Sequence, residues 1–269
     1  MKTYLVPVDF SDTSINAAEY AVALTKDIPE AQITLYNVYS RISFAALTEK
    51  EGSRKMVTDE ELETLKLKLS AAGNQNISIE SEEGSFIENI QRYVLGNHID
   101  MVIMGITGSS RLKQVFMGTN TLNVIRHINT PVMIIPPDAR FTGLKKVLFT
   151  SDFKDVARTT PFTSLKDILD TFKPSLEILN VDSEHYIELT DEFKIEKGSM
   201  KDKLSSYNPE FSFLSAFDFL DGINLFVEGK AIDAIITVPR KHSFLSQLFK
   251  TTHTKKLAYH SNIPTIAIH

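Results

Sequence analysis

The chain has 269 residues and no cysteine, with 42% hydrophobic and 23% charged residues and a formal net charge of −5. This is the composition of an ordinary globular protein with room for two domains, and it excludes disulfides and thiolate metal sites. Residues 1–140 hold 13 basic and 17 acidic side chains, and residues 141–269 hold 16 and 17. Because neither part has the basic excess that binding a phosphate backbone requires, we expect no nucleic-acid partner.

The N-terminal segment predicts neither a secretory leader nor a membrane anchor. The sequence after Met1 enters a strand-like segment without a hydrophobic leader. The apolar runs of the chain are all shorter than a bilayer crossing requires. We therefore expect a cytoplasmic protein with no membrane partner.

The first half alternates short apolar runs with helical patterns. Largely unbroken apolar runs are typical of parallel strands buried on both faces, and they fall at residues 3–8, 32–38, 76–81, 100–104 and 131–135. Helices are expected at residues 13–27, 57–72, 85–97 and 119–128, the first capped by Ser11 or Asp12. Residues 40–56 are expected to be an ordinary connection, with a mobile loop or a partner surface as the alternatives. This alternation predicts an α/β fold with a doubly wound sheet, which binds ligands at the carboxyl ends of its strands.

The second half of the chain repeats the first. Residues 6–10 and 33–38 match residues 149–153 and 176–181 at an offset of 143. Residues 99–104 and 129–135 match residues 232–237 and 262–268 at an offset of 133. Four matching segments in the same order indicate a tandem duplication.

The duplication predicts two tandem Rossmann-like domains, each with a five-stranded parallel sheet. Strands of the second copy are expected near residues 145–150, 175–181, 210–214, 233–237 and 264–268. A turn-rich linker from Pro136 to Gly143 places the domains at residues 1–140 and 141–269. Pro161 falls opposite Ala18, where a helix interior rejects proline. The first helix of the second copy is therefore expected to start late, with Thr159 or Thr160 as its cap and Pro161 in its first turn.

A glycine pattern follows the fourth apolar run of the first copy. Gly105 follows the run and Gly108 comes three positions later. Nine residues separate Gly108 from Gly118, Thr119 and Asn120, which stand where a helix is expected to start. Glycine lets backbone approach a ligand, and a helix start offers free N–H groups to phosphate. The pattern favours a nucleotide phosphate site, although a loop with three glycines can also be only a turn.

The spacing Gly-x2-Gly-x9-Gly-[Ser/Thr], with Val8-Asp9-Phe10 near the N-terminus, resembles the universal stress protein family. The resemblance covers the whole chain, one family domain per copy. It implies the adenine nucleotide alpha hydrolase-like fold and binding of ATP or AMP, with ADP and Mg²⁺ left open, in a family where several members have no established catalytic role. One departure is Ser109, because many members carry a basic residue there.

The resemblance assigns a nucleotide-binding role to ten residues of the first copy. Pro7, Val8 and Asp9 would meet the ribose or the adenine side, Val38 the adenine, and the glycine pattern the phosphates. Asp9 could equally cap the helix that begins near residue 13. The implied set is Pro7, Val8, Asp9, Val38, Met104, Gly105, Gly108, Gly118, Thr119 and Asn120.

The second copy has lost the glycine pattern. At the 133 offset, Val238, Lys241 and Thr251 replace the three glycines. Side chains there would stand where phosphates need bare backbone, so the second site is expected to be degenerate. The resemblance implies that the last strands of the two copies pair, which would make the monomer an internal pseudo-dimer and leaves a further homodimer open.

Three functions remain open at this point. The sequence favours a nucleotide-binding stress sensor or regulator with unidentified protein partners and one nucleotide in the first domain. A slow ATPase or autophosphorylating enzyme is the first alternative, but the P-loop lysine and an obvious base are missing. A nucleotide-independent adaptor is the second.

Overall fold

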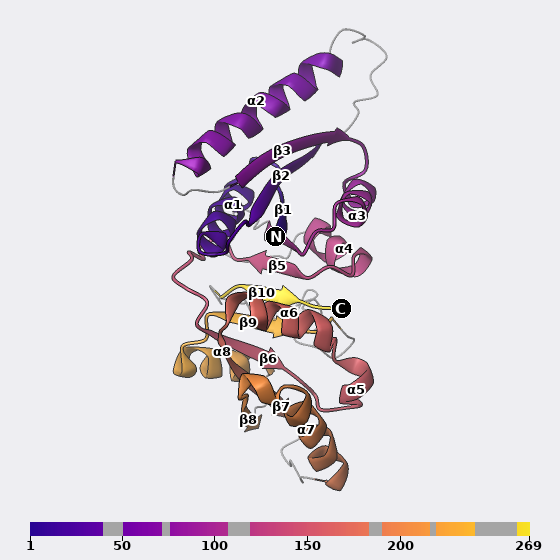
Figure 1. Ribbon diagram of the computed structural model, residues 1–269, viewed down its shortest axis with the longest axis vertical. Coiled ribbons are helices and arrows are strands. Elements are labelled where there is room, and N and C mark those ends of the chain that lie inside the picture. The colour runs from indigo at the N-terminus through magenta and orange to yellow at the C-terminus, as the bar shows by residue number, and fades with distance from the viewer. Residues whose placement is uncertain (40–50, 72–75, 107–118, 183–189, 216–218, 240–262) are drawn as a thin grey trace. The chain divides into compact units, whose positions relative to one another are not determined.

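The computed structural model describes residues 1–39, 51–71, 76–106, 119–182, 190–215, 219–239 and 263–269. These residues form two compact units, one from Met1 to Phe141 and the other from Thr142 to His269 (Figure 1). Each unit is a parallel sheet with helices, as the alternating pattern predicts.

The first unit has five strands and four helices in its described part. In chain order they are β1 (Thr3–Pro7), α1 (Asp12–Thr25), β2 (Gln32–Tyr39), α2 (Glu51–Ser70), β3 (Asn76–Glu83), α3 (Phe86–Gly96), β4 (Met101–Gly105), α4 (Thr119–His127) and β5 (Val132–Ile135). The sheet order is β3-β2-β1-β4-β5, and each neighbouring pair is parallel. All five strands expected from the apolar runs are confirmed.

Helices cover both faces of this sheet, with α1 and α2 on one face and α3 and α4 on the other (Figure 1). Central strands are therefore buried on both sides, which explains their unbroken apolar sequence. Helix α2 packs against the sheet through Leu62, Leu65 and Leu69, which are all buried. Ser11 is confirmed as the cap of α1, because its Oγ accepts the backbone N–H of Ser14 at 3.3 Å.

The second unit repeats this strand order. Its elements are β6 (Lys146–Thr150), α5 (Val156–Thr159), α6 (Phe162–Phe172), β7 (Ser175–Asp182), α7 (Asp191–Lys203), a 3₁₀ turn (Ser205–Tyr207), β8 (Glu210–Ser215), α8 (Phe219–Lys230), β9 (Ala234–Thr237) and β10 (Thr265–Ala267). The order β8-β7-β6-β9-β10 is again parallel at each neighbouring pair. Numbered within its own unit, each sheet therefore runs 3-2-1-4-5.

Equivalent polar contacts recur in the two units. A carboxylate holds the start of the first strand: Asp100 Oδ2 accepts the N–H of Thr3 at 2.7 Å, and Asp233 Oδ2 accepts that of Lys146 at 2.8 Å. These partners are related by the offsets read from the sequence. The duplication thus extends from the strand pattern to individual hydrogen bonds.

Two local predictions are wrong. Helix α2 begins at Glu51, so the end of the expected connection at 40–56 is helical, while residues 40–50 lie outside the described residues. The cap predicted for the second copy is also wrong: α6 has Pro161 itself as N-cap, and Thr160 closes the short helix α5. Thr160 is extended (φ −104°, ψ 118°), because a residue before proline avoids the helical region.

Candidate functional site

The candidate site lies where the order of strand addition in the first sheet reverses. From β1 the chain builds outward through β2 to β3, and then returns to place β4 on the other side of β1. The carboxyl ends of β1 and β4 therefore flank a topological switch point, where doubly wound sheets bind their ligands. The sequence-predicted residues Asp9 and Gly105 follow or end these two strands.

The turn after β1 is held by side-chain hydrogen bonds. Asn37 of β2 donates through Nδ2 to the carbonyl of the buried residue Val8 at 2.6 Å. Asp9 Oδ1 accepts the N–H of Ser11 at 3.1 Å and its hydroxyl at 2.5 Å. Phe10 between them has a left-handed backbone, with φ of 60°. Asp9 thus holds the cap residue of α1 and is not itself the cap.

The second unit contains the same turn. Asp152 Oδ1 accepts the N–H of Lys154 at 3.1 Å, and Phe153 between them has a φ of 49°. Asn180 Nδ2 donates to the carbonyl of Ser151 at 2.9 Å. Because this copy lacks the glycine pattern, the turn serves the fold whether or not a ligand is bound. The repeated asparagine is visible in both copies of the sequence and could have been found there.

Asp9 carries a negative charge at neutral pH. Partial burial raises the pKa of Asp9, but hydrogen bonds from Ser11 and Ser14 lower it by more, so the pKa lies below its ordinary value of 3.8. A carboxylate in this position can accept hydrogen bonds from hydroxyl or amino groups and repels phosphate. It therefore suits the nucleoside end of a nucleotide.

Gly105 is required by packing inside the protein. A Cβ at this position would overlap the carbonyl oxygen of Thr13 and lie 2.7 Å from its carbonyl carbon, in the first turn of α1. The prediction that the missing side chain makes room for a ligand therefore needs correction, because the backbone of α1 occupies this space. Thr121 of α4 donates to the Gly105 carbonyl at 3.3 Å, so the starts of α1 and α4 meet at the end of β4.

The two helix starts at this point differ in charge. Helix α1 has Asp12 in its first turn, and its cap is occupied by Ser11. Helix α4 begins at Thr119 and Asn120, with no acidic residue in its first turn and with Arg126 and His127 in its last. An anion is therefore favoured at the start of α4, where the positive end of the helix dipole is not neutralised.

The other predicted residues divide between the described and the undescribed parts of the chain. Pro7 ends β1, Met104 is buried in β4, and Val38 is half-buried in β2, the neighbour of β1. Gly108 and Gly118 lie outside the described residues. Except for these two glycines, the predicted set gathers at the carboxyl ends of β1, β2 and β4 and at the start of α4.

A polar network beside Val38 was not predicted. Tyr36, two residues earlier on β2, donates its hydroxyl to Glu82 of β3 at 2.7 Å, and Glu82 also accepts from Arg92 and from Asn89 at 3.1 Å. Burial and the neighbouring Glu82 raise the pKa of Tyr36 far above its ordinary value. The network fixes the end of β2 where Val38 stands. A charged residue inside a strand was its only signal in the sequence.

In the second unit, Val238 follows β9 at the place of Gly105, and Pro239 comes next. Lys241 and Thr251 lie outside the described residues. Thr237, which ends β9, has a buried hydroxyl that finds no hydrogen-bond partner among the described residues. The loss of the second nucleotide site stays a prediction.

The described residues contain no group of three or more His, Asp or Glu placed to hold a metal ion. None of the helices within the described ranges has the length and apolar character that crossing a membrane requires.

The fold and this arrangement define a doubly wound α/β protein whose candidate site lies at the switch point of its first unit. The model of the universal stress protein family matches residues 1–136. The chain belongs to the universal stress protein family and carries two such domains in tandem.

Individual relatives agree with this assignment. Two universal stress proteins of Methanocaldococcus jannaschii are 30% identical over 153 residues and 27% identical over 140 residues, each spanning 50% of this chain and, respectively, 94% and 81% of their own lengths. A solved universal stress protein from Archaeoglobus fulgidus matches 99% of this chain over 97% of its own, with a TM-score of 0.75 at 17% identity. The last match shows that the two-unit fold is shared.

Gly105→Ala is expected to lower the free energy of unfolding by about 1–3 kcal/mol, because its Cβ meets the backbone of α1 and one of the two elements must move. Hydrogen exchange of the β4 and α1 amides measures the loss in this unit. Gly96→Ala at the end of α3 is the matched control, since an added Cβ there meets nothing within 4 Å. Equal exchange in both variants would contradict the close-packing argument.

The lowered pKa of Asp9 predicts a dependence of stability on pH. Its ionised form is favoured in the folded state, so this contribution is complete above pH 3.8 and is lost as the pH falls through the lower, folded pKa. Asp9→Asn does not titrate, so the difference in unfolding free energy between wild type and variant should narrow on acidification. Urea unfolding at a series of pH values measures it. A difference that stays constant down to pH 2.5 would contradict the prediction.

Proposed function

We propose that the protein binds one adenine nucleotide, ATP, AMP or ADP, in its first unit and acts as a stress-response sensor or regulator. The observation that carries the proposal is the switch point between β1 and β4, flanked by the ionised Asp9 and by the start of α4, whose first turn has no acidic residue. One place thus offers a hydrogen-bond acceptor for a nucleoside and an electropositive helix start for phosphate.

In this proposal the two ends of the nucleotide are held by different elements. The nucleoside would be held at the ends of β1 and β2 by Pro7, Val8, Asp9 and Val38. The phosphates would lie against Thr119 and Asn120 at the start of α4, with Gly108 and Gly118 earlier in the chain. Met104 and Gly105 would support this site through the contact of β4 with α1 and α4.

Binding is favoured over catalysis by the chemistry of the described site. Asp9 has a lowered pKa, which makes it a weak base for activating water. If Mg²⁺ accompanies the nucleotide, the phosphates of the nucleotide would supply ligands to the ion, as is usual for Mg²⁺. Slow ATP hydrolysis and a nucleotide-independent adaptor role remain the alternatives, and we propose a pairing or interaction role for the second unit.

Calorimetric titration of the full chain with ATP, ADP and AMP should give a stoichiometry of one nucleotide per chain. Gly118→Val should abolish binding, because a branched side chain would occupy the space of the phosphates. Asp9→Asn should weaken binding by about tenfold, the effect of losing one charge-assisted hydrogen bond.

The duplication supplies a matched control. Asp152→Asn changes the equivalent turn of the second unit and should leave nucleotide affinity unchanged. A stoichiometry of two would contradict the loss of the second site. Absence of binding by the wild-type chain would favour the adaptor, and phosphate release that depends on Asp9 would favour the ATPase.

A further inference from the structure

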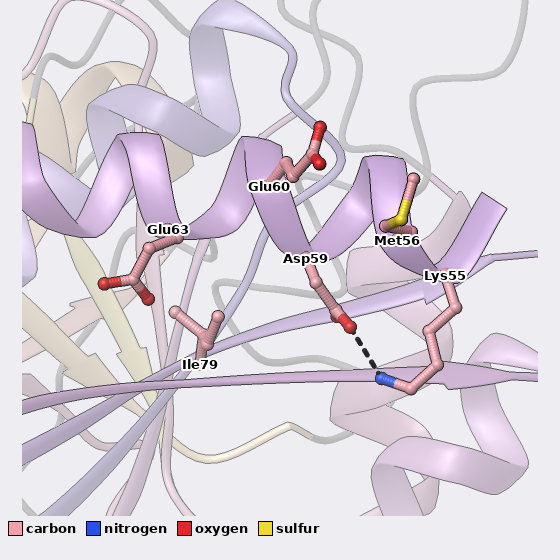
Figure 2. A pocket seen from close by; sticks show the side chains of 6 residues that line it. All are labelled: Lys55, Met56, Asp59, Glu60, Glu63 and Ile79. Atoms are coloured by element: carbon pink, nitrogen blue, oxygen red, sulfur yellow. Dashed lines mark hydrogen bonds and ion pairs between the residues drawn. The ribbon is translucent and has the colours of Figure 1, made fainter. Parts of the chain in front are cut away.

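The first unit has an open groove away from the switch point. It lies between α2 and β3, has a volume of about 510 Å³, and is lined by Lys55, Met56, Asp59, Glu60, Glu63 and Ile79 (Figure 2). Its shape is fixed by a clamp: the Lys55 ammonium lies 2.8 Å from Asp59 and 3.2 Å from the hydroxyl of Ser81, and Ser81 also donates to Asp59. The clamp holds the first part of α2 against β3.

The groove opens on the outer flank of α2. On the other flank, Lys68 forms an ion pair with Glu19 of α1 at 2.9 Å. Lys68 follows Asp59 by nine residues, which at 3.6 residues per turn places it on the opposite side of the helix. The groove residues therefore face away from α1, toward the outer edge of β3.

The outer edge of β3 has backbone groups that can accept another strand. Strand β3 pairs with β2 along its whole length, from Asn76 to Glu83, and in the described part of the chain it has no strand on its other side. An exposed edge of this length is a template for an added strand. A chain that pairs with this edge would run beneath the outer flank of α2, with alternate side chains reaching the groove.

The negative charge of α2 and β3 determines which kind of strand this edge can add. Helix α2 and β3 together carry eight acidic and four basic residues. Glu60 on the groove and Glu80 on the other face of β3 are both exposed, and neither forms an ion pair with a described residue. A second copy of this edge would bring like charges together, whereas a strand with lysine or arginine side chains on both of its faces would meet a carboxylate on each face.

The second unit fills the equivalent place with aromatic side chains. By strand register, Phe211 and Phe213 of β8 correspond to Ile79 and Ser81. Phe213 lies 6.0 Å from Phe153 and 5.5 Å from Phe193 between ring centroids, and the Lys197 ammonium stands 4.8 Å above its ring. Helix α7 carries four acidic and four basic residues, so the acidic open groove belongs to the first copy.

We propose that the outer edge of β3 and the α2–β3 groove bind a basic, extended peptide segment of a partner protein by strand addition. Backbone hydrogen bonds to β3 would supply affinity. The basic side chains of the segment would be selected by Glu60, Glu63 and Glu80. Its apolar side chains would contact Met56 and Ile79.

A fluorescent peptide that alternates pairs of lysines with pairs of valines, which places both residue types on each face of an extended strand, tests the proposal on the full chain by anisotropy. It should bind, and its affinity should fall with rising salt. A peptide with glutamate in place of lysine, and one with the lysines grouped at one end, should each bind at least about tenfold more weakly. Hydrogen exchange should show new protection of the β3 amides when the alternating peptide is bound.

Glu60→Gln with Glu80→Gln should weaken binding about fivefold, as expected for two exposed ion pairs. The matched control is Glu61→Gln with Glu88→Gln, which removes the same charge at exposed positions away from the groove. If the two double variants weaken peptide binding equally, the effect comes from net charge alone and the proposal is overturned. So would absence of binding, binding without protection of β3, or concentration-dependent self-association that protects β3 in the absence of peptide.

Discussion

The close approach of Gly105 to the first turn of α1 is the constraint on which the first unit depends. Only a residue without a side chain can end β4 against the Thr13 carbonyl, because a Cβ would overlap it. This approach brings the start of α1 to the carboxyl end of β4, and Thr121 brings the start of α4 to the same carbonyl. The positions of the Asp9 turn and of the α4 N-terminus both follow from this packing. A glycine that reads as a ligand feature in sequence is therefore a packing feature that builds the site.

The second unit shows this region without the constraint. Val238 stands in the place of Gly105, and the helix equivalent to α1 is divided into α5 and α6 at Pro161. Helix α5 keeps the first turn, since Val156–Thr159 corresponds to residues 13–16 of α1, and the division comes one turn later. Proline removes a backbone donor and bends the chain where α1 runs straight. The second unit thus keeps the sheet order and the first helical turn without a glycine after its fourth strand.

The sequence predicts the strands well because burial on both faces leaves an apolar run that no other local structure requires. It predicts the cap Ser11 because capping depends on neighbouring residues alone. The sequence does not predict the start of α2 at Glu51, because the segment there is polar and shows no apolar helical stripe. It also does not predict the capping of α6, because Pro161 restricts the backbone of the residue before it. The groove beside β3 and the Tyr36–Glu82 bond depend on strand register, which brings together residues far apart in the chain.

Comparison of the two units separates the requirements of the fold from those of a ligand. The Asp9 turn, the Asn37 bond and the Asp100 bond all have counterparts in the second unit, so their presence alone says nothing about binding. Gly105 and the open groove beside β3 occur in the first unit, while the second has Val238 and a phenylalanine cluster at those places. Gly105 leaves no opening, because the first turn of α1 fills its place, so the difference in space lies at the groove. There the phenylalanine cluster adds apolar contact, which stabilises the second unit. The first unit has an open groove at this place, and that surface is available to a binding partner.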